Sequence, residues 1–171
     1  MSTIYICALA DVDDHAARLE PGHMVSLLGD DPFPETPAGI ERERHLQLRF
    51  HDIDMPIDGY DPPQSHHIER LIDFGHGWRD EASVMVHCFA GVSRSTAAAL
   101  TLVAIRNPGR ELEAAGLLRQ LAPHAKPNRR MIALADEALG LSGRLAGAVE
   151  AMGEPDFSTM GALVALPVVF D

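Results

Sequence analysis

One short stretch of the chain brings together a cysteine, an arginine and several hydroxyl side chains. It reads Val84-Met85-Val86-His87-Cys88-Phe89-Ala90-Gly91-Val92-Ser93-Arg94-Ser95-Thr96, and an alanine-rich apolar run follows it. This order predicts a buried strand, a tight loop and a helix that begins where the loop ends. The N–H groups at a helix N-terminus bind anions, and arginine holds oxyanions through paired hydrogen bonds. We therefore predict a phosphate-binding loop over residues 89–94, with a thiol at its start.

Cys88 has two interpretations, a nucleophile or a small buried apolar residue. A free thiol is mostly protonated at neutral pH, but a helix N-terminus, loop N–H groups and Arg94 would all favour the thiolate. His87 could brace the loop or add to that effect. A lone cysteine would favour burial alone. The complete pattern of His-Cys, five residues and Arg-Ser between a strand and a helix favours the nucleophile.

The composition bounds the remaining possibilities. A chain of 171 residues is most simply one domain, and we take residues 1–171 as a single phosphate-processing domain. The net charge of −11 argues against nucleic acid or an anionic membrane as partner. The two cysteines imply no disulfide framework, and Cys7 is expected to be a buried structural residue. With no apolar run long enough to span a membrane and no leader pattern, we expect a cytoplasmic protein.

Strands alternate with helices in the first half of the chain, and helices dominate the second. Apolar and alternating patterns predict strands over Thr3–Leu9, Met24–Leu28, His45–Phe50 and Ser83–Val86. Predicted helices cover 15–19, a segment from about 64 to 78, 95–105, 111–121, 129–139 and 142–152. We therefore expect an α/β fold with a central, mostly parallel sheet of four to five strands flanked by helices. The tail, about 153–171, stays open: 164–170 could be a late strand or an extended segment.

The segment from His87 to Ser95 resembles the active-site loop of the cysteine-dependent protein tyrosine phosphatase superfamily. It is closest in style to the compact dual-specificity and bacterial tyrosine-phosphatase-like branch. The resemblance implies a phosphotyrosine-phosphatase-like fold, attack of a thiolate on phosphorus, a cysteinyl-phosphate intermediate and hydrolysis by water. It also implies that Arg94 clamps two phosphate oxygens and that Ser95 stabilises the thiolate as it leaves. We predict no metal ion and no other cofactor.

The chemistry of this family needs a carboxylic acid that protonates the leaving group. The family carries it on a loop after the preceding strand, where this chain has an acidic loop with Asp52, Asp54, Asp58 and Asp61. We favour Asp52, because it follows the strand residue Phe50 almost immediately. The segments 50–52 and 62–64 are similar to the general-acid segment of phosphatases related to lipid phosphatases. Asp54 is the alternative, and the other aspartates are expected to be turn or cap residues.

Asn128 is a weaker candidate, in a Pro-Asn pair before a predicted helix. The pair resembles a Pro-Asn of dual-specificity phosphatases, in which the asparagine supports the phosphate loop. An asparagine at this place is also a good helix N-cap, and both functions are compatible.

The loop between Cys88 and Arg94 contains no lysine or arginine. Phosphoinositide phosphatases of the superfamily tend to carry basic residues there, so we expect a monophosphate substrate. A phosphotyrosine on a protein or peptide is favoured, although pocket depth decides between tyrosine and serine or threonine. Two alternatives stay open: a catalytically weak phosphate-binding module, and a cysteine-based sulfurtransferase or arsenate-reductase-like enzyme. A reductase would want a usable second thiol, which Cys7 fits poorly. The oligomeric state stays open.

Overall fold

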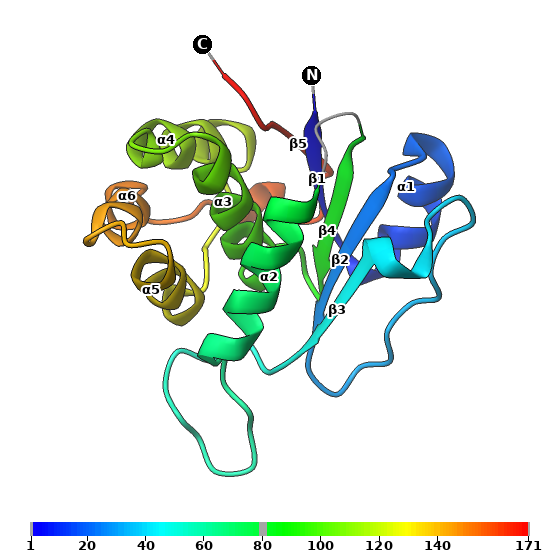
Figure 1. Ribbon diagram of the computed structural model, residues 1–171, viewed down its shortest axis with the longest axis horizontal. Helices are drawn as coiled ribbons and strands as arrows, with labels where there is room; N and C mark the ends of the chain where they lie inside the picture. Colours follow the sequence, from blue (N-terminus) through cyan, green and yellow to red (C-terminus); the bar gives the residue numbers. More distant parts are fainter. Residues whose placement is uncertain (1, 79–81, 171) are drawn as a thin grey trace.

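The computed structural model describes residues 2–78 and 82–170, and it shows a five-stranded sheet in the order β3-β2-β4-β1-β5 (Figure 1). Four strands run parallel: β1 (Thr3–Ala8), β2 (His23–Leu28), β3 (His45–Arg49) and β4 (Val84–Cys88). The fifth, β5 (Val164–Pro167), pairs antiparallel with β1 at the edge. The predicted α/β fold with a mostly parallel sheet is thereby confirmed.

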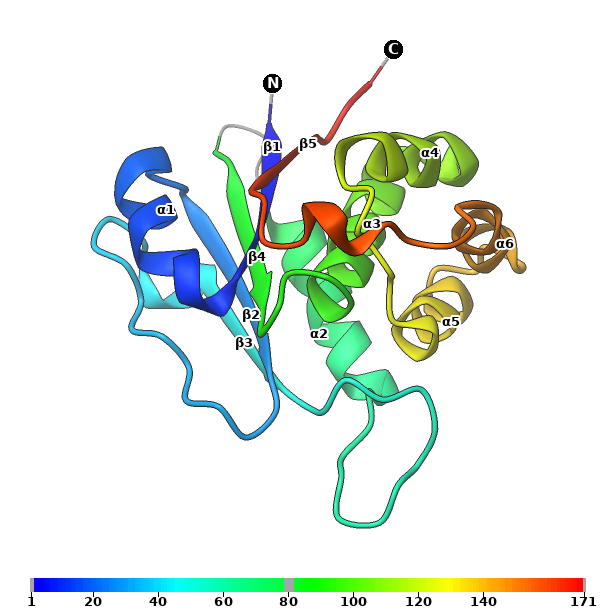
Figure 2. The same ribbon diagram turned by 180° about the vertical axis from the view of Figure 1, so that it is seen from behind.

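The two faces of the sheet are covered unequally (Figures 1 and 2). One face packs against the larger helical layer, which consists of α2 (Ser65–Gly77), α3 (Arg94–Arg106), α4 (Glu111–Leu121), α5 (Arg129–Ala138) and α6 (Arg144–Ala151). The other face carries α1 (Val12–Leu19) and a smaller apolar cluster. Because side chains alternate along a strand, β4 sends Val84, Val86 and Cys88 into the larger core and Met85 into the smaller one.

Most predicted elements lie within a few residues of the observed ones, and α4 has the predicted bounds. The strand β4 continues to Cys88, two residues beyond the prediction, because both neighbouring strands still pair with it there. Helix α6 begins at Arg144, since Ser142 and Gly143 have left-handed φ angles of 55° and 85°. Three short 3-10 turns connect elements: Leu9–Asp11, Arg42–Arg44 and Phe157–Thr159.

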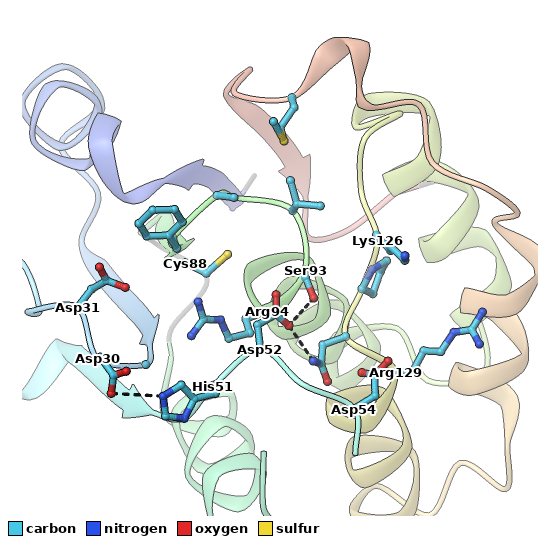
Figure 3. A pocket seen from close by; sticks show the side chains of 17 residues that line it. Asp30, Asp31, His51, Asp52, Asp54, Cys88, Ser93, Arg94, Lys126 and Arg129 are labelled. Carbon is cyan, nitrogen blue, oxygen red and sulfur yellow. Dashed lines mark hydrogen bonds and ion pairs between the residues drawn. The ribbon is translucent and has the colours of Figure 1, made fainter. Parts of the chain in front are cut away.

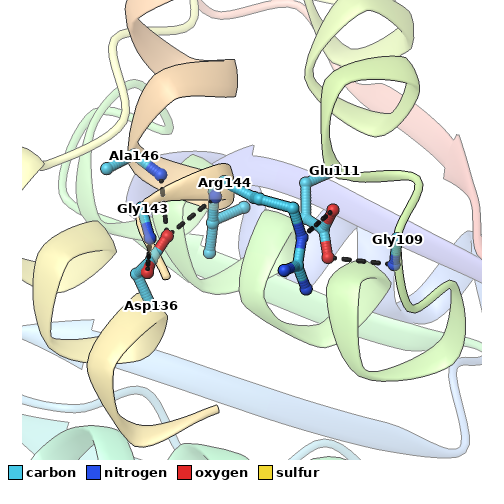
Figure 4. A network of polar contacts seen from close by, with 7 residues as sticks. Gly109, Glu111, Asp136, Gly143, Arg144 and Ala146 are labelled. Atoms are coloured by element: carbon cyan, nitrogen blue, oxygen red, sulfur yellow. Dashed lines mark hydrogen bonds and ion pairs between the residues drawn. The ribbon is translucent and has the colours of Figure 1, made fainter. Parts of the chain in front are cut away.

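Buried carboxylates hold the helical layer together (Figure 4). Asp136 of α5 accepts hydrogen bonds from the backbone N–H groups of Gly143 (2.6 Å), Leu145 (2.7 Å) and Ala146 (3.1 Å). It therefore caps the N-terminus of α6, where a negative charge is stabilised. Glu111 of α4 accepts from Gly109 N–H at 3.0 Å and pairs with Arg144 at 3.2 Å. These contacts fix α5, whose N-terminal end reaches the pocket described below.

Within the described residues, no helix is long and apolar enough to cross a membrane.

Candidate active site

Cys88 ends the central strand β4, at the carboxyl edge of the parallel strands, where such sheets bind ligands. A pocket of about 700 Å³ opens there (Figure 3). Its walls come from the loops after β2, β3 and β4, from the segment before α5 and from Met160. The two loops that the sequence singled out, around Cys88 and Asp52, thus meet in one pocket.

The carbonyl groups of the loop after β4 accept hydrogen bonds from neighbouring segments of the chain. The carbonyl of Phe89 accepts from Leu9 N–H (3.1 Å), that of Val92 from Lys126 N–H (3.0 Å), and that of Ser93 from Asn128 N–H (3.3 Å). In contrast, the backbone N–H groups of residues 90–93 donate to no acceptor in the described parts of the chain. A loop whose carbonyls are bound and whose N–H groups are free is suited to an anion.

Gly91 is required twice in this loop. Its φ of 72° lies in the left-handed region, which favours glycine. A Cβ at this position would also lie 2.9 Å from the carbonyl carbon and 3.0 Å from the carbonyl oxygen of Cys7 in β1. The glycine therefore lets the loop turn tightly over the end of the neighbouring strand.

Cys88 and Ser95 are paired at the bottom of the pocket. The thiol sulfur lies 3.2 Å from the Ser95 hydroxyl oxygen, and both residues are buried. Ser95 stands in the first turn of α3, so this hydroxyl is held at a helix N-terminus together with free N–H groups. The arrangement can hydrogen-bond a sulfur anion.

Arg94 is only 6% exposed, yet it lines the pocket. One terminal nitrogen donates to the carbonyl of Phe50 at 2.8 Å, which fixes the guanidinium between the two loops. Its Nε is buried without a hydrogen-bond partner. A buried guanidinium N–H without an acceptor is costly, so this geometry favours the binding of an oxyanion.

Asp52 contacts the loop after β4 and the segment before α5 through one carboxylate oxygen. Its Oδ1 accepts from the Ser93 hydroxyl at 2.7 Å and from the Asn128 side-chain amide at 2.8 Å. The other oxygen, Oδ2, has no hydrogen-bond partner in the described residues. A carboxyl group oriented in this way has one oxygen free to carry a proton. Asp54 also lines the pocket but makes no hydrogen bond to the described loop residues.

Asn128 connects three elements. Its Oδ1 accepts from Met131 N–H at 2.9 Å and so caps α5, as its position in the sequence predicted. Its side-chain amide holds Asp52, and its backbone N–H holds the carbonyl of Ser93. Asn128 thereby connects the loop that carries Asp52 to the loop after β4.

His87 and Cys7 lie on the other side of the sheet from the pocket. The ring of His87 is buried and its Nε2 is 2.6 Å from the hydroxyl of Ser26. Burial raises the pKa of Cys7 to about 12, and Asp11 and Cys88 add to the effect. Cys7 packs in the smaller apolar cluster, whereas Cys88 belongs to the larger one. Cys7 is therefore a structural cysteine here, unsuited to serve as the second thiol of a reductase.

Apart from His51 and Pro127, which belong to segments quoted from the sequence, six pocket residues were not anticipated: Gly29, Asp30, Asp31, Lys126, Arg129 and Met160. Asp30 and Asp31 follow β2, so the rule that ligands bind at carboxyl ends of parallel strands would have found them. His51, beside Asp52, was part of the quoted segment, and its Nε2 lies 3.3 Å from Asp30 (Figure 3). Met160 belongs to the tail that the sequence left open, and no local pattern marks it.

No protein-family model matches the sequence. A curated relative, dual specificity protein phosphatase 12 of Mus musculus, is 32% identical over 119 residues, which cover 66% of this chain and 34% of the mouse protein. The alignment therefore spans about a third of that relative's length.

Solved structures agree with this similarity. DUSP15 matches with a TM-score of 0.61 and 22% identity, covering 89% of this chain and 91% of that one. Human DUSP28 matches with a TM-score of 0.60 and 21% identity, covering 81% of this chain and 94% of that one. The Yvh1 phosphatase domain from Chaetomium thermophilum matches with a TM-score of 0.58 and 18% identity, covering 83% of this chain and 93% of that one. The chain has the fold of the dual-specificity phosphatases, and the predicted resemblance to the protein tyrosine phosphatase superfamily is confirmed.

Proposed function

We propose that the chain is a phosphomonoester hydrolase of the cysteine-dependent protein tyrosine phosphatase type. The observation that carries the proposal is the buried Arg94, whose Nε lacks a partner beside a loop with free N–H groups and a thiol. These groups together fit one phosphate. The 32% identity to a dual-specificity phosphatase supports the same activity.

The proposed reaction has two steps. In the first, the Cys88 thiolate attacks phosphorus, the bond between phosphorus and the ester oxygen breaks, and Asp52 gives its proton to that oxygen. In the second, water attacks the cysteinyl phosphate, Asp52 takes a proton from the water, and the sulfur leaves as a thiolate that accepts a hydrogen bond from Ser95. Arg94 and the N–H groups of residues 89–94 bind the phosphate oxygens throughout, where charge stabilisation contributes most.

Phosphotyrosine in a protein or peptide is the proposed substrate. Cys88 is 2% exposed at the floor of the pocket, while Phe89 and Met160 in its walls are 59% and 58% exposed. A phenyl ring that carries the phosphate to this floor can pack against the exposed side chains of Phe89 and Met160. The lack of lysine or arginine between Cys88 and Arg94 favours a single phosphate.

Two further proposals concern the chain as a whole. Residues 1–171 would form one phosphatase-like domain, supported by β5 of the tail, which joins the central sheet, and by Met160, which lines the pocket. A cytoplasmic location is proposed because the nucleophilic thiol has to stay reduced and both cysteines are free.

The test is turnover of a phosphotyrosyl peptide at about pH 6 by the wild type and by Cys88→Ser, Arg94→Lys and Asp52→Asn. We expect Cys88→Ser to abolish turnover and Asp52→Asn to reduce kcat by about 10²–10⁴-fold, the usual contribution of general acid catalysis. Asp54→Asn is the matched control, because Asp54 lines the same pocket without contacting the phosphate loop. Undiminished turnover by Cys88→Ser would refute the mechanism. A loss in Asp54→Asn with none in Asp52→Asn would move the acid to Asp54.

A further inference from the structure

A line of hydrogen bonds crosses three strands and ends beside the proposed nucleophile. The Thr36 hydroxyl is 2.8 Å from Nδ1 of His45 in β3, and Nε2 of that ring is 2.7 Å from the hydroxyl of Ser26 in β2. The same hydroxyl is 2.6 Å from Nε2 of His87 in β4, the residue before Cys88. Ser26 and His87 face each other directly in the strand register. A partly buried surface loop is thus connected to the start of the phosphate loop.

The inner part of this line is closed to solvent. Ser26 and His87 are 0% exposed and His45 is 9% exposed. Burial lowers the pKa of both histidines to about 4; for His87 the backbone of Cys88 opposes this effect, and His45 and Arg94 add to it. Both rings are therefore neutral near pH 7. Each neutral ring has one donor and one acceptor nitrogen, and a buried polar atom without a partner is costly.

The single proton of the Ser26 hydroxyl couples the two rings. Since it is donated to only one Nε2, the other Nε2 has to donate to the Ser26 oxygen. The protonated nitrogen of one ring therefore fixes that of the other. Without the Ser26 hydroxyl, Nε2 of His87 would have no partner in the described residues. The ring would then lose what sets its orientation directly before Cys88.

We propose that Ser26 and His45 are positioning residues, which fix the orientation and tautomer of His87 and thereby keep Cys88 in its reactive thiolate form. This inference rests on the proposed function of Cys88 as the nucleophile. It extends the site from the pocket to the opposite face of the sheet. Met24 and Met85 lie two residues before Ser26 and His87 on the same strands, so they share a face with them, and both pack in the smaller cluster.

The experiment measures the rate of alkylation of Cys88 by iodoacetamide as a function of pH, with the labelled peptide identified by mass spectrometry. Cys7 stays protonated because burial raises its pKa to about 12. Arg94 at the start of α3, His87 in β4 and Cys7 in β1 are titratable or charged groups close to the reacting thiol. The pocket adds the charged and titratable side chains of Asp30, Asp31, His51, Asp52, Asp54, Lys126 and Arg129. They are unchanged in the variants Ser26→Ala and His45→Phe. Ser26→Ala is expected to shift the midpoint of the alkylation profile upward by about one pH unit, which below both midpoints slows alkylation about tenfold.

His45→Phe is expected to shift the midpoint in the same direction. Ser26→Thr, which keeps the hydroxyl, should retain the wild-type profile, and Thr101→Val is the matched control. Thr101 is also a buried hydroxyl residue, but it bonds only the carbonyl of Ala97 within α3. Thermal unfolding identifies folded variants, and His45→Phe decides the outcome if Ser26→Ala does not fold.

Wild-type profiles in folded Ser26→Ala and His45→Phe would overturn the inference, and so would an equal shift in Thr101→Val. Alkylation needs only the thiolate, not turnover. A wild-type midpoint at the value of an ordinary free thiol would therefore contradict the proposed function itself. A lower wild-type midpoint that the variants leave unchanged would contradict only the positioning by Ser26 and His45.

Discussion

Asn128 allows the orientation of the proposed acid to be tested separately from the stability of the fold. Its Oδ1 caps α5, and its side-chain amide donates to Asp52 at 2.8 Å. Asn128→Ser keeps an oxygen suited to the N-cap but removes the amide donor. Asn128→Ala removes both groups. Both variants therefore lose the hydrogen bond to Asp52, but only Asn128→Ala also loses the N-cap of α5.

The magnitude follows from the burial of this contact. Asn128 is 3% exposed, and Asp52 becomes a charged acceptor as it gives up its proton; a hydrogen bond to a charged acceptor contributes about 1.5–3 kcal/mol. If that energy serves to orient the acid, kcat falls by about 10–150-fold in both variants, since 1.4 kcal/mol is a factor of ten. Asn128→Ala should also lower the free energy of unfolding by about 1 kcal/mol relative to Asn128→Ser, because the cap is lost.

The assay compares two substrates and one further variant. A phosphotyrosyl peptide has a poor leaving group that needs the acid, whereas nitrophenyl phosphate has a good one that needs it less. The loss should therefore be larger with the peptide. Ser93→Ala, which removes the second donor to Asp52 Oδ1, should show the same substrate dependence. Equal losses with both substrates, or none with the peptide, would refute the view that Asn128 acts through Asp52.

Three further predictions concern the loop, the buried histidines and the helical layer. Gly91→Ala should reduce activity more than tenfold, because the new Cβ would meet the backbone of Cys7. Gly109→Ala is the control, since Gly109 also has a positive φ, 86°, but no atom lies within 4 Å of its Cβ. This control shares only the backbone strain and should remain active in the same turnover assay. Burial lowers the pKa of His45, His67 and His87 to about 4, so the unfolded chain binds protons first as pH falls. The stability that depends on the neutral rings is present above pH 6.5 and is lost towards pH 4, by up to about 3 kcal/mol for the fully buried His87 and by less for the other two rings. Urea unfolding against pH measures this loss, and a flat profile would contradict it. Asp136→Ala removes three hydrogen bonds from backbone N–H groups and should lower the free energy of unfolding by about 2–3 kcal/mol, while exposed Asp58→Ala should not change it.

The conformation of the loop between β4 and α3 could be predicted because the residues that shape it are contiguous. A strand, Cys88, a glycine turn and Arg94 follow one another in the sequence. A tight loop between a strand and a helix places its N–H groups at the helix N-terminus, so few other conformations fit this order of residues. The open assignment of the tail is decided by β5, which pairs with β1, a contact between the two ends of the chain. Periodicity in one short segment carries no information about such a partner.

The arrangement around Asp52 could be predicted only in part. Its place after a parallel strand brought it to the correct edge of the sheet. Its preference over Asp54 was made from its place after Phe50, whereas its contacts with Ser93 and Asn128 come from two other loops and could not be predicted from that place. The same holds for Ser26 and His45, which are unremarkable strand residues in the sequence and meet His87 only when the strands pair.

The most direct test of the central claim is rapid-quench mass spectrometry during turnover of a phosphotyrosyl peptide. The proposed mechanism predicts a phosphate on the peptide that contains Cys88 during the steady state, and no such peptide in Cys88→Ser. Asp52→Asn should still show it with nitrophenyl phosphate, because that leaving group needs less acid catalysis while hydrolysis of the intermediate becomes slow. Turnover without phosphate on Cys88, or with phosphate on another residue, would contradict the account.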